Sequence, residues 1–233
     1  MLLSVDTSTR YASVALSNGE RVVASRTWHS TINHTAELMP AVVQILEGAG
    51  LAAAELDGIA VALGPGGFSA LRVGISTAKG LALVGKTPIV GVGTLDMEAH
   101  PYLKAGMTVC SLLEAGRQEC ATALYGPDGL RTREDRVCTA EELLAEITGP
   151  ALFCGEGVTP WELQIKEALG EKAHTVKSPS SARVWALAAI GQQRLDAGDR
   201  DDVITLQPEY LRMPSIGVQK QRDRLPQPGR SGR

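Results

Sequence analysis

The sequence predicts an α/β fold made of two similar halves, each built on a mixed sheet. Two observations predict this class. Apolar stretches with strand character alternate with stretches of helical spacing along residues 2–197, and the opening pattern recurs 108 residues later. A hydrophobic fraction of 44% in 233 residues is enough for a buried core, which excludes disorder for most of the chain.

Three predicted antiparallel strands open the first half. Leu2–Val5 is a short apolar run, and residues 12–16 form a second strand. Asn18-Gly19 is typical of a hairpin turn, so residues 21–28 are expected to run back beside the second strand.

Helices and strands alternate through the rest of the first half. Apolar residues recur at helical spacing over residues 33–46, where Pro40 predicts a kink or a later helix start. Residues 58–63 are an unbroken apolar run typical of a buried strand, and a second helix is predicted from about 69 to 84. A strand over 88–92 and a third helix complete a β-β-β-α-β-α-β-α order. That order is the ribonuclease H-like arrangement.

The second half repeats this beginning. A shift of 108 residues places Asp6 on Glu114 and Leu16 on Leu124, and both segments pass from a strand through an acid and a polar turn to an Ala-rich strand. Further elements are predicted at 133–138 (strand), 140–147 (helix), 151–154 (strand), 158–169 (helix) and 181–197 (helix). We therefore expect two lobes, residues 1–105 and 106–206, with a cleft between them. A chance match of two short Ala-rich strands is the alternative.

Charge is distributed unevenly, although the whole chain carries only −3. From Arg212 onward six cations stand against one acid, which gives the end of the chain +5 and leaves −8 on residues 1–211. An acidic body is a poor surface for nucleic acid, so any RNA must be brought by a partner or by the tail. Residues 207–233 form this tail, and we expect disorder beyond about residue 213. Contact with RNA phosphates and simple solubility are both open roles for its cations.

Several kinds of site are excluded by missing patterns. The four cysteines are 10, 18 and 16 residues apart and contain no Cys-x-x-Cys pair, and the four histidines contain no His-x-x-x-His pair. The sequence also lacks a Gly-x-Ser-x-Gly nucleophile turn, a basic leader and an 18-residue apolar run. We therefore expect a cytoplasmic protein with no metal site, no complete catalytic site and no membrane segment.

Two glycine segments match or resemble phosphate-binding loops. Residues 80–87 match Gly-x₄-Gly-Lys-Thr, but they end a predicted helix and precede a strand, which is the reverse of a P-loop. We interpret Gly85 as a helix C-cap and Lys86 as a favourable charge at the helix end. Gly64–Ser69 joins a strand to a helix and can present backbone amides to an anion. A tight turn that uses glycine at positive φ is the interpretation that we favour.

A third candidate is the turn formed by Asp6, Thr7, Ser8 and Thr9. It resembles the phosphate-binding turn of actin-like kinases, in which the acid reaches magnesium, although Ser8 stands where glycine would allow the closest approach. A hairpin capped by its own hydroxyl groups is the other interpretation. An ATP-dependent phosphotransferase that uses Asp6 is accordingly the alternative function.

The helix predicted after residue 69 carries a stripe of small residues, spaced four apart: Ala70, Gly74, Ala78 and Ala82. Small side chains let two helices approach closely. The stripe can contact the sheet of its own lobe or a helix of a partner, and the sequence leaves both open.

Several segments together resemble the TsaB (YeaZ) family. They are residues 3–9, 12–16, 57–61, 64–74, 78–82, 91–95 and 208–212. The resemblance covers about residues 1–212. It departs from the usual Ser, Thr and Gly at Gly67, Ser69 and Ala70, and from the usual Asp-Ala-Arg-Arg at residues 114–117.

The resemblance implies a two-lobed actin-like fold and a non-catalytic subunit for making N6-threonylcarbamoyladenosine in tRNA. It implies pairing with a TsaD-like catalytic subunit and help in recruiting a TsaE-like ATPase, with tRNA reached only through the complex. No intrinsic cofactor is implied. ATP or ADP at the subunit interface and a homodimer in isolation remain open. A metalloprotease, suggested by older family labels, lacks a metal pair and a nucleophile.

The resemblance also implies that helices of the first lobe form the pairing interface. The expected interface residues are Leu38, Met39, Val42, Leu71, Gly74, Ile75 and Ala78.

Overall fold

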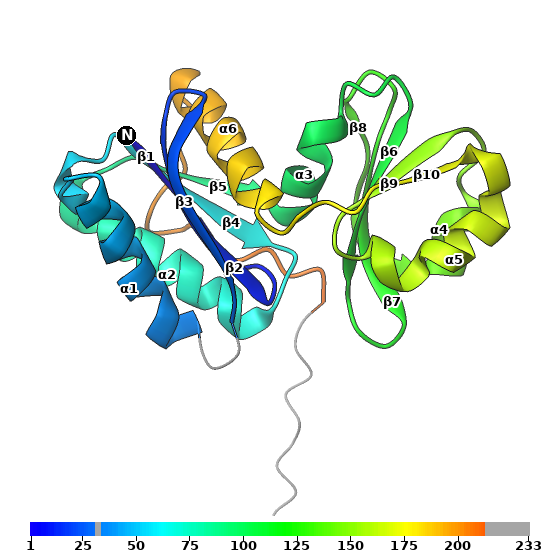
Figure 1. Cartoon of the computed structure of the whole chain (residues 1–233), viewed down its shortest axis with the longest axis horizontal. Coiled ribbons are helices and arrows are strands. Elements are labelled where there is room, and N and C mark those ends of the chain that lie inside the picture. Colours follow the sequence, from blue (N-terminus) through cyan, green and yellow to red (C-terminus); the bar gives the residue numbers. More distant parts are fainter. Residues whose placement is uncertain (31–33, 213–233) are drawn as a thin grey trace, which may run out of the picture.

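The computed structural model describes residues 1–30 and 34–212. Over these residues the chain forms two lobes that lie side by side, each built on a mixed sheet of five strands (Figure 1). Residues 213–233, where we expect disorder, lie outside the described part of the chain.

The first lobe has the predicted ribonuclease H-like order of elements. Its strands are β1 (Leu2–Asp6), β2 (Tyr11–Asn18), β3 (Arg21–His29), β4 (Gly58–Gly64) and β5 (Ile89–Gly93), and its first helices are α1 (His34–Gly48), α2 (Phe68–Gly85) and α3 (Thr94–Ala99). The sheet order is β3-β2-β1-β4-β5, with β1 antiparallel to β2 and parallel to β4. Helix α1 contains Pro40 in its interior, so the later start, one of our two alternatives, is wrong, while the kink stays a prediction. The predicted start at residue 33 lies outside the described residues.

The second lobe confirms the predicted repeat. It contains β6 (Thr108–Glu114), β7 (Glu119–Tyr125), β8 (Arg131–Thr139), α4 (Ala140–Ala145), β9 (Ala151–Cys154), α5 (Val158–Leu169) and β10 (Ala173–Thr175). The strand order is β10-β9-β6-β7-β8. Read from the other end, it is the order of the first sheet, with β6 to β10 in the places of β1 to β5. Asp6 pairs with Ser13 at the end of one hairpin, as Glu114 pairs with Cys120 at the end of the other.

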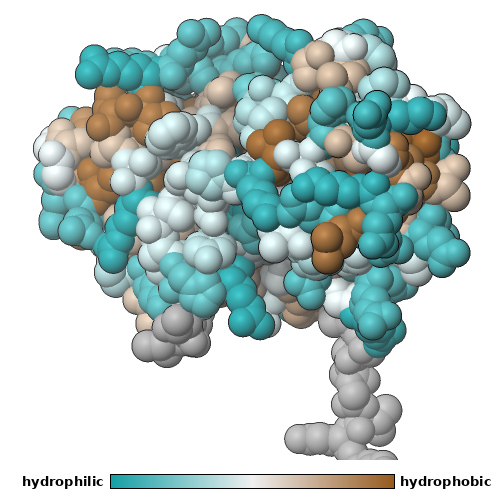
Figure 2. Space-filling model, turned by 45° about the vertical axis from the view of Figure 1, so that its right-hand side comes forward, coloured by the Kyte–Doolittle hydropathy of each residue, from teal (hydrophilic) through white to brown (hydrophobic). Residues whose placement is uncertain are grey.

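Both sheets are covered on both faces. Leu3 and Val5 of β1 pack with Leu38 and Val42 of α1 in the core of the first lobe. In the second lobe α4 and α5 cover one face, while α3 covers the other with Leu95 and Ala99. Helix α3 thus lies between the lobes (Figure 1). On the face in Figure 2, hydrophobic residues lie in separate patches among hydrophilic ones. Within residues 1–30 and 34–212, no helix has the length and apolar character needed to span a bilayer.

Helix α6 (Ala182–Asp196) corrects the expected lobe boundaries. We expected residues 106–206 to form the second lobe, but α6 packs on the sheet of the first lobe. Ala186 and Leu187 of α6 pack in one buried cluster with Leu2 of β1 and Ala60 of β4. The second lobe therefore ends near β10, because the apolar face of α6 covers the side of the first sheet that α1 and α2 leave open.

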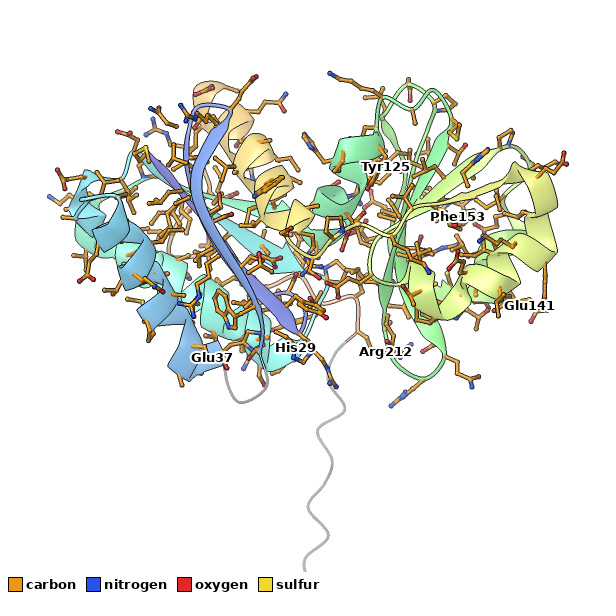
Figure 3. All side chains as sticks on the ribbon, viewed as in Figure 1. His29, Glu37, Tyr125, Glu141, Phe153 and Arg212 are labelled. Atoms are coloured by element: carbon orange, nitrogen blue, oxygen red, sulfur yellow. The ribbon has the colours of Figure 1, made fainter. Side chains whose placement is uncertain are left out.

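Residues 201–212 form a strap that joins the lobes. The Nζ atom of Lys79 donates to the carbonyl groups of Ile204 and Leu206, at 2.9 Å each. The ring of Tyr210 then stacks on Phe68, with the ring centroids 4.7 Å apart. Arg212 reaches Glu119 of the second lobe at 2.6 Å, and it lies between the lobes in Figure 3. The expected tail from residue 207 is therefore ordered through residue 212.

Candidate functional site: a buried arginine where the lobes meet

The turn after β1 is held by its own side chains. Asp6 is fully buried, and its Oδ1 atom accepts bonds from the backbone N–H of Ser8 at 2.8 Å and from Ser8 Oγ at 2.6 Å. The hydroxyl of Thr7 donates to the carbonyl of Ala70 at 2.7 Å. These bonds correspond to the hydroxyl-capped turn that we described as one interpretation of this segment.

The glycine loop after β4 packs directly against this turn. The N–H of Gly67 donates to the carbonyl of Ser8 at 2.8 Å, and a Cβ atom at Gly66 would overlap that same carbonyl. Gly64 adopts a φ of 120° and lies so close to Glu209 that a Cβ atom would be 2.6 Å from its carbonyl oxygen. The loop is thus the tight turn that we favoured, and its Gly67 amide bonds to Ser8.

The segment that matches the P-loop pattern ends α2. Lys86, with φ of 52°, is the left-handed C-cap residue, and its backbone N–H bonds to Ala82. We expected Gly85 in this position, and it is instead the last residue of the helix. The position of the segment at a helix C-terminus is as predicted, and such an end does not attract phosphate.

Arg183, in the first turn of α6, is the centre of the site. Its side chain is 1% exposed, and all its nitrogen atoms donate hydrogen bonds. Nε reaches Asp6 Oδ2 at 2.8 Å, Nη1 reaches Glu98 Oε1 at 3.1 Å and also Glu156, and Nη2 reaches Thr9 Oγ1 at 2.8 Å and the carbonyl of Tyr11 at 3.1 Å. These five bonds match the five N–H donors of a guanidinium.

The partners of Arg183 come from both lobes. Asp6 and Thr9 belong to the first lobe, Glu98 lies on α3, and Glu156 follows β9 in the second lobe. Thr9 Oγ1 also donates directly to Glu156 Oε1 at 3.1 Å. The arginine thus joins the two lobes deep in the space between them.

The cluster places three carboxyl groups around one buried cation. Burial raises the pKa of Glu98 to about 7, although Arg183 acts in the opposite direction. Burial alone would lower the pKa of Arg183, but Asp6, Glu98 and Glu156 together raise it, so the guanidinium stays charged. Near neutral pH Glu98 therefore carries a proton part of the time, which reduces the excess of negative charge.

A magnesium nucleotide does not fit the residues around Asp6. Both carboxylate oxygens of Asp6 are engaged, one by Ser8 and the other by Arg183. The guanidinium lies where a metal would have to approach the acid. Among the residues that the structure describes, no group of three or more His, Cys, Asp or Glu side chains is arranged to hold a metal ion. We therefore derive no chemical step from Asp6.

The seven expected interface residues differ in burial. Six of them are buried in the first lobe: Leu38, Val42, Leu71, Gly74, Ile75 and Ala78. Met39 alone of the seven is exposed, at 41%. A Cβ atom at Gly74 would overlap the hydroxyl of Thr7, so the small-residue stripe serves close packing within its own lobe. The six buried residues cannot be surface contacts, which corrects our expectation.

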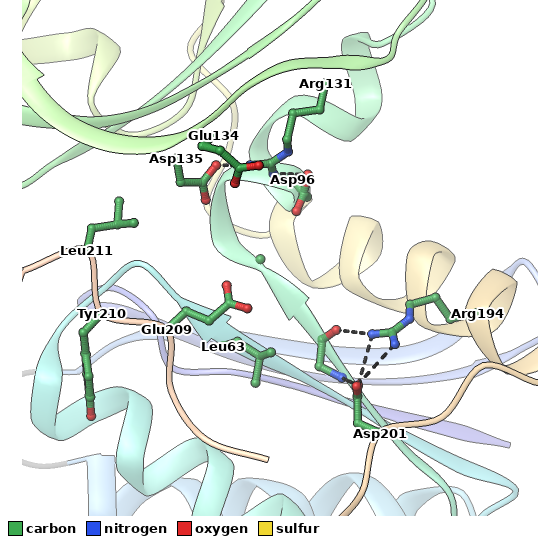
Figure 4. A pocket seen from close by; sticks show the side chains of 12 residues that line it. Leu63, Asp96, Arg131, Glu134, Asp135, Arg194, Asp201, Glu209, Tyr210 and Leu211 are labelled. Carbon is green, nitrogen blue, oxygen red and sulfur yellow. Dashed lines mark hydrogen bonds and ion pairs between the residues drawn. The ribbon is translucent and has the colours of Figure 1, made fainter. Parts of the chain in front are cut away.

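A pocket of about 700 Å³ lies between the lobes, beside the strap (Figure 4). Its charged lining consists of Asp96, Glu134, Asp135, Asp201, Glu209, Arg131 and Arg194. Both arginines are already paired: Arg131 with Asp96 at 2.5 Å, and Arg194 with Asp201 at 3.1 Å. Burial raises the pKa of Glu209. Five acids against two paired arginines make this pocket unfavourable for a phosphate group.

Comparison with known proteins gives consistent results. A family model described as TsaD, tRNA N6-adenosine threonylcarbamoyltransferase, matches residues 22–193. Two relatives named tRNA threonylcarbamoyladenosine biosynthesis protein TsaB are each 30% identical to the chain, one from Bacillus subtilis (strain 168) over 219 residues and one from Escherichia coli (strain K12) over 224 residues. Each alignment covers 91% of this chain and 94% of the relative.

The fold agrees with a solved structure as well. The structure of YeaZ from Pseudomonas aeruginosa superposes with a TM-score of 0.71 at 25% identity, covering 90% of this chain and 99% of that one. The chain thus has the predicted two-lobed actin-like fold, with Arg183 and its carboxyl partners between the lobes.

Proposed function

The chain belongs to the TsaB (YeaZ) family, and we propose that it acts as the non-catalytic subunit that pairs with a TsaD-like catalytic subunit. Family membership assigns the chain to tRNA threonylcarbamoyladenosine biosynthesis, the pathway named for the two relatives. The match to the TsaD model supports two subunits of shared fold.

The engagement of Asp6 by Arg183 is the observation that carries the non-catalytic role. A function has to be argued from the site, because one fold can carry many activities. In this chain the acid that an actin-like phosphotransferase would use is buried and fully bonded. The lobes are held together by a side chain, so the cleft needs no nucleotide to close it.

We propose that the exposed faces of α1 and α2 form the pairing surface. Met39 and Val43 are 41% and 42% exposed on α1, and Leu83 is 52% exposed on α2. Ser76 and Gly80 are exposed on the same helix, and small residues favour a close approach of partner helices. This surface replaces the buried set that the sequence suggested.

The remaining partners follow from that pairing. We propose that a TsaE-like ATPase binds the assembled pair, that tRNA contacts the catalytic subunit first, and that any ATP or ADP binds at the interface between subunits. Without a TsaD-like partner, a second copy of this chain would use the same face and form a homodimer. A cytoplasmic location fits a tRNA substrate.

The pairing surface can be tested by calorimetric titration of variants with the TsaD-like subunit. Met39→Glu and Gly80→Leu should each weaken binding by about tenfold or more, since they place a charge or a bulky group in the contact. Gly80 has no heavy atom within 4 Å of its Cβ position, so its substitution leaves the lobe intact.

Leu163→Glu is the matched control, because Leu163 is a 78% exposed apolar residue on α5 of the other lobe. Its affinity should equal that of the wild type. Equal affinity of all three variants would show that the pairing surface lies elsewhere.

A further inference from the structure

Two cysteines lie opposite each other on neighbouring strands of the second lobe. Cys120 of β7 pairs in register with Cys138 of β8, and both side chains belong to the same buried cluster. Directly opposed residues of antiparallel strands have Cα atoms about 4.5–5.5 Å apart. A disulfide spans Cα distances of about 4.4–6.8 Å, so the backbone already holds a suitable spacing.

The two thiols have different environments. Cys120 Sγ donates to the carbonyl of Cys138 at 3.5 Å. The neighbouring side chain of Cys120 lowers the pKa of the Cys138 thiol to about 7, against the effect of burial, and Arg136 adds to the lowering. The interaction with Cys138 and burial raise the pKa of Cys120. Near neutral pH the pair therefore combines a thiolate with a neighbouring thiol that can resolve a sulfenic acid.

In the other two cysteines, Cys154 Sγ donates to the carbonyl of Cys110 at 3.7 Å, but neither thiol has a lowered pKa. Burial raises the pKa of Cys110 to about 12 and that of Cys154 well above its usual value. Their strands are parallel, and Cys154 stands opposite Ser111 rather than Cys110. Both thiols are fully buried. They serve as internal controls in the same sheet.

We propose that Cys120 and Cys138 form a reversible disulfide when the protein meets hydrogen peroxide. Cys138 is 6% exposed and Cys120 is 1% exposed, so access is limited to a small oxidant, and the outer of the two thiols reacts first.

The reaction proceeds in two balanced steps. The thiolate of Cys138 attacks one peroxide oxygen, the O–O bond breaks, and the released hydroxide takes up a proton, which leaves a sulfenic acid and one water. The thiol of Cys120 then attacks the sulfenic sulfur, the S–O bond breaks, and a second water forms. Two thiols are oxidised and one peroxide is reduced to two waters. Two molecules of a small thiol such as glutathione reverse the disulfide by exchange.

Mass spectrometry of the full chain tests the proposal. The native protein is treated with peroxide, unfolded, alkylated with N-ethylmaleimide and digested with trypsin without reduction. Residues 118–131, with Cys120, should be linked to residues 137–166, which contain Cys138 and Cys154. The linkage should persist in Cys110→Ser and Cys154→Ser and disappear in Cys138→Ser. Its initial rate should rise about tenfold from pH 6 to pH 8, as the thiolate of Cys138 forms.

Three outcomes would overturn the proposal. They are the absence of linked peptides in the native chain, a linkage that survives Cys138→Ser, and a linkage that forms only when urea is present during oxidation. The first and third concern the wild-type chain, so the test holds even where a variant folds poorly.

Discussion

Replacement of Arg183 by methionine should destabilise the protein by about 3–5 kcal/mol, the range for loss of one partner from a buried ion pair. Methionine fills part of the volume but leaves Asp6 and Glu98, which are 0% and 3% exposed, without their cation. We expect the lower part of the range, because Asp6 keeps both bonds from Ser8 and Glu98 can take up a proton.

Arg183→Lys separates the charge of the side chain from its geometry. Lysine keeps the positive charge but has three donors on a single nitrogen, so it can serve at most three of the five acceptors around Arg183. With two or more of the five hydrogen bonds lost, we expect a decrease of about 1–2 kcal/mol in the free energy of unfolding.

Urea unfolding at neutral pH, analysed by linear extrapolation, measures both variants. Arg133→Met is the matched control, because Arg133 forms an ion pair with Glu146 while its side chain is 48% exposed. Such surface pairs contribute about 0–1 kcal/mol. If Arg183→Met cost no more than this control, Arg183 would not be the residue that holds the lobes together.

Three further predictions follow from the same contacts. Burial raises the pKa of Glu98 to about 7, so its bound proton contributes fully to the free energy of unfolding below about pH 4.5, and this contribution is lost as the pH rises through 7. Glu98→Gln should flatten this decline, as measured by urea unfolding between pH 5 and 8. Gly74→Leu should lower the melting temperature by overlap with Thr7, at a cost of about 1–3 kcal/mol, whereas Gly80→Leu should leave it unchanged or higher. Calorimetry of the isolated chain with magnesium ATP should detect no binding that depends on Asp6. If tight binding were seen and were lost in Asp6→Asn, the phosphotransferase alternative would be restored.

Much of the fold could be predicted because its signals are local. The Asn18-Gly19 turn, the unbroken apolar run at residues 58–63 and the helical spacing over 158–169 each lie within one element. The structure places β9 and α5 at the predicted residues. The repeat was detectable because both halves use the same hairpin followed by the same strand order.

The candidate site could not be predicted in the same way, since its contacts join distant segments. Arg183 and Asp6 are 177 residues apart, and Glu98 and Glu156 come from two further elements. One signal was present: Arg183 is the single charged residue in the apolar start of a predicted helix, residues 182–190. Such a cation on a buried helix face requires a buried partner.

The prediction of the interface residues was wrong for a related reason. The sequence shows which face of α2 is the more apolar, and the core of the first lobe takes that face. The opposite face, with Ser76, Gly80 and Leu83, is available to a partner but carries a weaker pattern. Which face is buried and which stays exposed depends on how the helix packs on its sheet, and the helical period alone does not determine this.

The most direct test of the proposed pairing role is the rate of tRNA threonylcarbamoylation by the TsaD-like subunit as this chain is titrated into a reconstituted reaction. No modification is expected from this chain alone, and the rate should rise with its concentration to a plateau at equal amounts of the two subunits. Modification by this chain without its partner, or a rate independent of its concentration, would contradict a non-catalytic pairing role.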